Sequence, residues 1–149
     1  MTIDPTITSQ AIAALTACLL TAFLTHRIFR KNYSMNERNR LDGMLNQIIA
    51  FSITYPYLED EKFIAAWLKQ RNSGDEKYLR YEAYCIYNFN FLDQLARFYK
   101  FKKEKVEDFV HIQEIVRMHA EWWRHPTGEY DNIEGYSEDF RNFINTYLQ

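Results

Sequence analysis

The stretch that decides the fold is ITSQAIAALTACLLTAFLTHRIFRK, from Ile7 to Lys31. Its first 18 residues, which end at Leu24, carry no formal charge. As a helix they would be roughly 27 Å long at about 1.5 Å per residue, and the hydrocarbon core of a bilayer is about 30 Å thick. We therefore predict a transmembrane anchor and basic stop in residues 1–31, with a buried helix of a soluble protein as the alternative.

The charges around this run predict its orientation in the membrane. No Lys or Arg precedes it, whereas Arg27, Arg30 and Lys31 follow it directly. By the positive-inside rule, the amino end lies outside and the carboxyl end in the cytoplasm, in a single pass through a bacterial inner membrane. A secretory signal peptide is disfavoured, because the amino end carries Asp4 but no basic residue and no small-residue cleavage site follows the run.

The predicted anchor is only weakly apolar, because Ala and Thr are frequent in it. Ala14, Cys18 and Ala22 recur at a spacing of four, and Thr21 and Thr25 belong to an adjoining row. Small residues allow helix backbones to approach closely, and threonine hydroxyls can bond across the contact. These five residues are the predicted face for self-association, and a ring of such helices with its threonines turned inward would line a pore.

Residues 32–149 are predicted to form a cytoplasmic up-and-down bundle of about five helices, which makes the fold class all-α. Apolar residues recur at helical spacing throughout, and no alternating strand pattern of useful length is present. Pro56 and the Asn72–Asp75 loop separate the first three helices. The predicted helices start at Asn36 (a candidate N-cap), Leu58, Glu76, Lys103 and Ser137 (a second N-cap), and the third, which is rich in aromatic residues, is expected to be central.

No enzyme chemistry and no cofactor are predicted. A formal net charge of -2 does not fit a polybasic nucleic-acid binder, and the two cysteines, Cys18 and Cys85, indicate neither a disulfide framework nor a thiolate metal site. The chain contains no glycine-rich phosphate loop, and no Ser or Cys nucleophile lies in a recognisable motif.

One helical face nevertheless carries metal-ligating residue types. At spacings of three and four, this face presents Glu107, His111, Glu114, Met118, Glu121 and His125. Metal sites in helical bundles pair carboxylate and imidazole groups in this way, but they need ligands from at least two helices. Because no second helix after residue 26 carries a histidine, a solvated face is the favoured interpretation and no metal is predicted.

RNA cleavage and RNA binding are also disfavoured. Helical nucleases of the higher-eukaryote and prokaryote nucleotide-binding type need an Arg four to six residues before a His in the sequence, and none of the four histidines has an Arg at that distance upstream. A basic run interleaved with aromatic residues could touch RNA or an anionic membrane surface, although a solvated helix junction is the favoured interpretation. The basic residues of this run are Arg97, Lys100, Lys102, Lys103 and Lys105.

The segments YPYLEDEKFIAAWL (55–68), EWWRH (121–125) and YSEDFRNFI (136–144) follow the weak anchor and its basic stop. Together they resemble small bacterial single-pass membrane-anchored helical proteins. In layout they also resemble the membrane accessory proteins of type VI-B CRISPR systems. This resemblance implies an oligomeric pore with a cytoplasmic helical domain that acts in antiviral defence, and it transfers no site residue.

Two functions are therefore expected from the sequence. The first is a membrane-anchored homo-oligomer, in contact with membrane lipid, that perturbs or gates the membrane as a defence effector or accessory. The alternative is a membrane-tethered helical module that binds a cytoplasmic protein or RNA partner without forming a pore.

Overall fold

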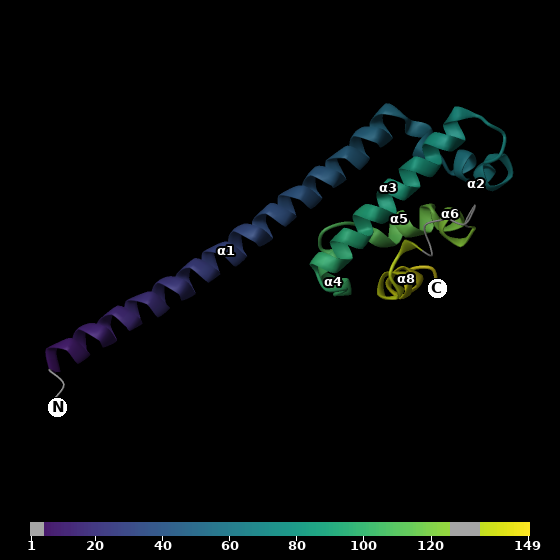
Figure 1. The fold of residues 1–149 in the computed structure, drawn as a ribbon. Helices are drawn as coiled ribbons and strands as arrows, with labels where there is room; N and C mark the ends of the chain where they lie inside the picture. The colour runs from purple at the N-terminus through teal and green to yellow at the C-terminus, as the bar shows by residue number, and fades with distance from the viewer. Residues whose placement is uncertain (1–4, 126–134) are drawn as a thin grey trace. The chain divides into compact units, whose positions relative to one another are not determined.

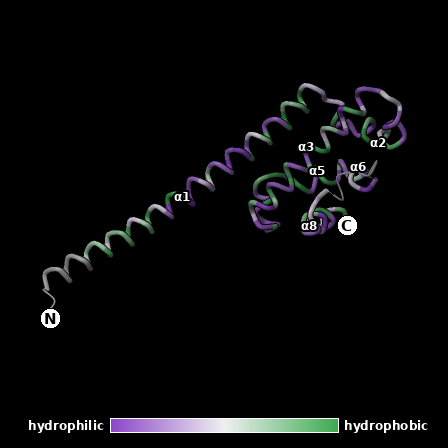
Figure 2. The backbone as a smooth tube through the Cα atoms, viewed as in Figure 1, coloured by the Kyte–Doolittle hydropathy of each residue, from purple (hydrophilic) through white to green (hydrophobic). Residues whose placement is uncertain are grey.

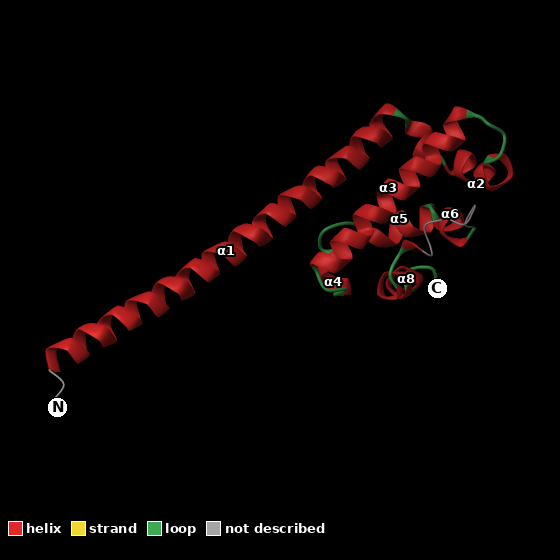
Figure 3. Cartoon of the chain, in the orientation of Figure 1, coloured by secondary structure: helices red, strands yellow, loops and turns green. Residues whose placement is uncertain are grey.

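The computed structural model describes residues 5–125 and 135–149, with side chains described from Ala13 onward. The described residues form helices joined by short loops, with no strand among them (Figures 1 and 3). The helices are α1 (Pro5–Thr54), η1 (Pro56–Glu59), α2 (Glu61–Gln70), α3 (Glu76–Phe98), α4 (Lys103–Glu107), α5 (Ile112–Met118), α6 (Ala120–Arg124) and α8 (Glu138–Asn145). The predicted all-α class is confirmed.

Within the described parts of the chain, no helix is long and apolar enough to cross a membrane. The predicted anchor begins outside the described side chains, because Ile7 and Ile12 precede Ala13.

The chain divides into two compact units, Met1–Arg40 and Leu41–Gln149. From Pro5 to the end of the first unit α1 is a single helix, and every residue from Ala13 to Asn36 is exposed. The second unit contains all the buried residues of the described chain, so the hydrophobic core lies there.

Helix α1 runs without a break through the position where the sequence predicted a helix start. Asn36 lies inside the helix, so its prediction as an N-cap was wrong. No proline interrupts the chain between Pro5 and Pro56, and a single interior glycine at Gly43 does not break a helix of this length. The helix ends at Thr54 because Pro56 restricts the residue before it and cannot donate a backbone hydrogen bond.

The core of the second unit is built around α3. The sequence places one stripe at helical spacing along this helix, from Tyr81 to Tyr99. Its members Tyr81, Tyr84, Cys85, Asn88, Phe91, Leu92 and Leu95 are all buried, whereas Tyr99 is half-buried. Phe89, about 40° around the helix from Cys85, is also buried and stacks on Trp122 and Trp123 with ring centroids 5.1 and 4.8 Å apart. Side chains of α3 contact α1, α2 and α6, so the helix is central, as predicted.

The predicted single helix from Lys103 to His125 was wrong, because the structure has three short helices there. The chain leaves the helix after Glu107 and enters α5 at Ile112, then turns again at His119 before α6. Val106 and Ile112 are both fully buried although six residues separate them. In one continuous helix they would point about 120° apart, and the break allows both to face the core.

The carboxyl end of the second unit closes the core as the sequence predicted. Ser137 caps α8, and its hydroxyl accepts a hydrogen bond from the backbone N–H of Phe140 at 3.4 Å. Phe140 and Ile144 are fully buried, and the Phe140 ring contacts Trp123 edge-on at 5.9 Å. The helical bundle is thus confirmed, with more and shorter helices than the five expected.

Candidate functional site

The first candidate site is the exposed apolar surface of α1. Figure 2 shows hydrophobic residues along the early part of this helix and hydrophilic residues after them. The large side chains there are strongly exposed: Leu15 is 65% exposed, Leu19 71% and Phe23 58%. Because continuous apolar surface is unfavourable in water, such a surface usually marks a contact with lipid or another protein.

The predicted self-association residues all lie on this exposed stretch. Ala14, Cys18 and Ala22 share one face because they recur every four residues, and Cys18 is an exposed free thiol. The Thr21 hydroxyl donates a hydrogen bond of 2.8 Å to the carbonyl of Ala17. That bond satisfies the hydroxyl proton within the helix, which lowers the cost of placing Thr21 in an apolar environment. Thr25 is exposed on the same stretch.

The predicted basic stop follows this stretch on the same helix. Arg27, Arg30 and Lys31 are exposed, and no carboxylate forms an ion pair with them within the described residues. The Arg27 guanidinium lies 5.8 Å from the centre of the Phe23 ring, within range of a cation–π contact.

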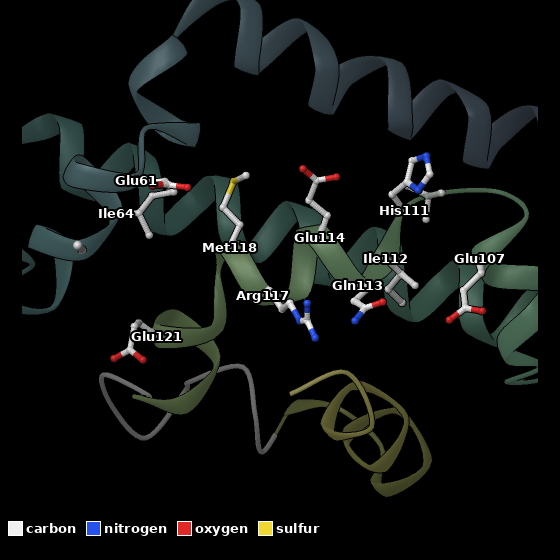
Figure 4. Close-up of a pocket in the computed structure, with 12 residues that line it drawn as sticks. Glu61, Ile64, Glu107, His111, Ile112, Gln113, Glu114, Arg117, Met118 and Glu121 are labelled. Atoms are coloured by element: carbon white, nitrogen blue, oxygen red, sulfur yellow. The ribbon is translucent and has the colours of Figure 1, made fainter. Parts of the chain in front are cut away.

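The second candidate site is a groove of about 850 Å³ in the Leu41–Gln149 unit, which we call the acidic groove. The groove is lined by five residues of the helical face that carries metal-ligating residue types: Glu107, His111, Glu114, Met118 and Glu121. They lie along the groove although the single helix predicted for them is divided into shorter ones. Helix α2 contributes Glu61, Ile64 and Ala65, while Val110, Ile112, Gln113 and Arg117 complete the lining. Figure 4 shows these side chains along α5 and its neighbours.

The carboxylates of the acidic groove differ in their partners. Glu107 pairs with Lys103 at 3.8 Å, and Glu121 contacts Arg124 at 3.4 Å and His125 at 3.3 Å. Neither Glu61 nor Glu114 forms an ion pair within the described chain. No group of three or more His, Cys, Asp and Glu residues in the described parts is placed to hold a metal ion.

A third site, which sequence analysis missed, lies between the last turns of α1 and α5. It is a pocket of about 520 Å³ with mostly apolar walls and a polar floor, and we call it the polar-floored pocket. It is lined by Leu45, Ile48, Ile49, Ser52, Ile53, Glu59, Tyr84, Asn88, His111, Glu114, Ile115, Met118 and His119.

Three side chains from three elements form a hydrogen-bonded trio at this floor. Glu59 Oε1 accepts hydrogen bonds from the Ser52 hydroxyl at 2.6 Å and from the Tyr84 hydroxyl at 2.7 Å, and the two hydroxyl oxygens are 2.8 Å apart. Burial raises the pKa of Tyr84, and its bond to Glu59 adds to this effect. The phenol therefore stays protonated and acts as a donor to the carboxylate.

His119 borders the same pocket and is almost fully buried. Its Nδ1 lies 3.0 Å from the hydroxyl of Tyr81 in the core. Burial lowers the pKa of His119 from 6.5 to about 4, although the negative charge of Glu59 acts in the opposite direction. The imidazole is consequently neutral at physiological pH.

The signal for this pocket in the sequence is weak, since Ser52, Glu59 and Tyr84 show no common spacing. Pro56 ends α1 and starts η1, and this turn brings Glu59 back toward Ser52. A turn at Pro56 is predictable from the sequence, whereas the position of Tyr84 depends on how α3 packs.

Comparison with protein-family models, with curated proteins and with solved structures finds no match to this chain. The functional argument therefore depends on the residues and the geometry described above.

Proposed function

We propose that this protein is a membrane-anchored homo-oligomer whose packed α1 helices alter the permeability of the membrane. The observation that carries the proposal is the exposed, uncharged stretch of α1 from Ala13 to Thr25. Its large apolar residues cover about half of the helix circumference, since Leu15 and Leu24 point in opposite directions at 100° per residue, and uncharged Ala, Cys and Thr residues cover the other half. A helix that has large apolar residues over half of its surface and no charged side chain on the other half can be surrounded by apolar material, as a membrane span is.

Self-association follows from the composition of this stretch. A helix rich in Ala and Thr inserts with little free energy to spare, so contacts between helices would add to its stability in the bilayer. Ala14, Cys18 and Ala22 supply a face of small side chains for close packing. Thr21 and Thr25 are tolerable within the bilayer where they face one another or water rather than lipid.

The basic stop sets the orientation in this proposal. Arg27, Arg30 and Lys31 lie beyond the apolar stretch and would remain on the cytoplasmic side of a bacterial inner membrane. The amino end would then face outward, and the Leu41–Gln149 unit would lie in the cytoplasm. This proposal includes a role as an antiviral defence effector or accessory, and the resemblance in layout is the only support for that role.

The experiment that tests this function measures membrane depolarisation and dye entry in cells that express three forms of the protein. The full chain should depolarise the membrane, and a chain without residues 1–31 should not. A variant with Ala14→Leu, Cys18→Leu and Ala22→Leu is the matched control, because it keeps a more apolar anchor but loses the small-residue face. Depolarisation by the truncated chain, or none by the full chain at any expression level, would refute the permeability function.

A second candidate function is favoured by the acidic groove. Because Glu61 and Glu114 form no ion pair within the described chain, the groove would attract a partner protein with a basic segment. RNA is a poorer fit, since like charges repel and the basic run is partly neutralised by Arg97–Asp93 and Lys103–Glu107 pairs. In this case the protein is a tethered interaction module that forms no pore.

Charge reversal separates the two functions. A Glu61→Lys, Glu114→Lys double variant should lose a chemically cross-linked partner if the module function holds, and depolarisation should be unaffected if the pore function holds. A Glu138→Lys, Asp139→Lys double variant is the control, because it changes the net charge by the same amount at two exposed carboxylates in the first turn of α8.

A further inference from the structure

We propose that the polar-floored pocket binds a small organic cation, namely a primary ammonium group attached to an apolar chain. The pocket lies wholly within the Leu41–Gln149 unit, and its volume of about 520 Å³ falls within the range of small-molecule sites. The inference does not depend on membrane insertion or self-association of α1.

The walls of the pocket fit an apolar chain. Leu45, Ile48, Ile49 and Ile53 line one side from the last turns of α1, and Ile115 and Met118 line the other from α5. Ile49 and Ile53 are 47% and 74% exposed, so part of this apolar surface is in contact with water when the pocket is empty. An alkyl chain placed between the two walls would remove that surface from water.

The charges of the lining residues favour a positively charged ligand. Among its lining residues are two carboxylates, Glu59 and Glu114, but no lysine or arginine. Neither carboxylate forms an ion pair within the described residues. His119 adds no positive charge, because burial keeps its imidazole neutral. The pocket is therefore negative at neutral pH and disfavours an anion.

One carboxylate of the pocket, that of Glu59, is exposed to solvent but is held in a fixed position. Ser52 and Tyr84 both donate to Glu59 Oε1, whereas Oε2 accepts no hydrogen bond from the described part of the chain. An ammonium group bound at Oε2 would therefore meet an acceptor that is already oriented. Charge-assisted hydrogen bonds of this kind are roughly twice as strong as neutral ones.

Two buried polar side chains complete the floor. Asn88 is 1% exposed and His119 is 2% exposed, and both border the pocket. His119 Nδ1 is engaged with Tyr81, while Nε2 forms no hydrogen bond within the described chain. A ligand that carries a polar group can therefore bond to Nε2, whereas an entirely apolar ligand leaves it without a partner.

A metal ion is a poorer occupant than an organic cation. The pocket contains Glu59, Glu114, His111 and His119, yet the described residues include no group of three such side chains close enough to share an ion. The apolar walls also offer nothing to an inorganic ion.

Isothermal titration of the full chain in a non-ionic detergent tests the proposal, with n-hexylammonium chloride as the probe. Saturable binding with one site per chain is expected. The matched probes n-hexanol and n-hexanoate have the same chain length, and at least about tenfold weaker binding is expected for both, because neither can form the charge-assisted bond to Glu59. Equal binding of hexanol would show that only the apolar walls matter, and the proposed ammonium site would be wrong.

Variants then locate the site. Glu59→Gln keeps an oxygen that accepts from Ser52 and Tyr84, so the fold should persist, but binding of hexylammonium should weaken by about tenfold or more. Glu61→Gln is the matched control, because Glu61 lines the acidic groove and not this pocket, and its affinity should equal that of the native chain. Ile49→Trp should also abolish binding by filling the mouth. Absence of saturable binding to the native chain, or unchanged affinity in both Glu59→Gln and Ile49→Trp, would overturn the proposal.

Discussion

His119 illustrates how burial fixes the charge of a single residue. Its ring lies against Tyr84 and its Nδ1 faces the Tyr81 hydroxyl, so a protonated imidazole would lose hydration without gaining a buried anion in direct contact. The pKa of His119 is about 4 in the folded chain, compared with an ordinary value of 6.5.

This difference predicts a loss of stability in acid. Between pH 6.5 and about 4 the unfolded chain binds a proton at His119 that the folded chain does not. The contribution of the neutral His119 to the free energy of unfolding is therefore complete above pH 6.5. It is lost as the pH falls toward 4, by an amount on the order of 3 kcal/mol. The measurement is the free energy of unfolding in urea at pH 7.5 and pH 4.5, for the native chain and for His119→Gln.

His119→Gln should show a smaller loss of stability in acid than the native chain. His125→Gln, a change at an exposed residue, should behave as the native chain does. A parallel decline in the native chain and His119→Gln would contradict the assigned pKa.

Two glycines make a matched pair of predictions about backbone conformation. Gly43 lies inside α1 with open space around an added Cβ, so Gly43→Ala should stabilise the protein by about 0.5–1 kcal/mol. Gly74 has a φ of +77°, which side chains rarely adopt, so Gly74→Ala should destabilise it even though space is available. Urea unfolding measures both changes, and a destabilising Gly43→Ala would indicate that α1 is not helical at that point.

At the scale of the helix, the small-residue face of α1 predicts a specific cross-linking pattern. Cys18 is exposed, whereas Cys85 is buried and the pKa of its thiol is raised by burial, so oxidation of the full chain in membranes should act through Cys18 alone. If the small-residue face is the contact, disulfide-linked dimers should form efficiently from Cys18. They should form poorly when the cysteine is moved to position 17 or 19 in a Cys18→Ala background. Equal yields at all three positions would mean that α1 has no specific contact face.

The helices differ in how well the sequence predicts them. The α3 stripe was predictable because its buried residues keep one helical period, and Ser137 was predictable because its side chain caps the helix locally. The breaks before and after α5 were not predictable, because neither proline nor glycine lies between Lys103 and His125. The break between α4 and α5 accompanies the joint burial of Val106 and Ile112, which is a tertiary effect.

The same distinction applies to the candidate sites. The face that contains Glu107, His111 and Glu114 was visible as a spacing, and the structure brings these residues into one groove. The contribution of Glu61 could not be predicted, because it depends on how α2 packs beside α5. The Glu59 trio was hidden for the same reason, since Tyr84 is 25 residues away in the chain.

At the scale of the whole molecule, anchoring and assembly can be separated. The full chain should remain with membranes after washing with alkaline carbonate, and a chain without residues 1–40 should be released. The triple variant Ala14→Leu, Cys18→Leu, Ala22→Leu should stay in the membrane, because leucine favours insertion, yet it should migrate as a smaller species in detergent. Release of the full chain by carbonate would refute the predicted anchor.

The distribution of tryptophan gives each unit its own optical signal. All three tryptophans, Trp67, Trp122 and Trp123, are buried in the Leu41–Gln149 unit, and none is more than 5% exposed. Indole fluorescence therefore reports on the packing of that unit and contains no direct contribution from α1 before Leu41. Far-ultraviolet circular dichroism, in contrast, sums the helices of both units. A lipid, detergent or amine that changes only one of the two spectra thereby reveals which unit responds to it.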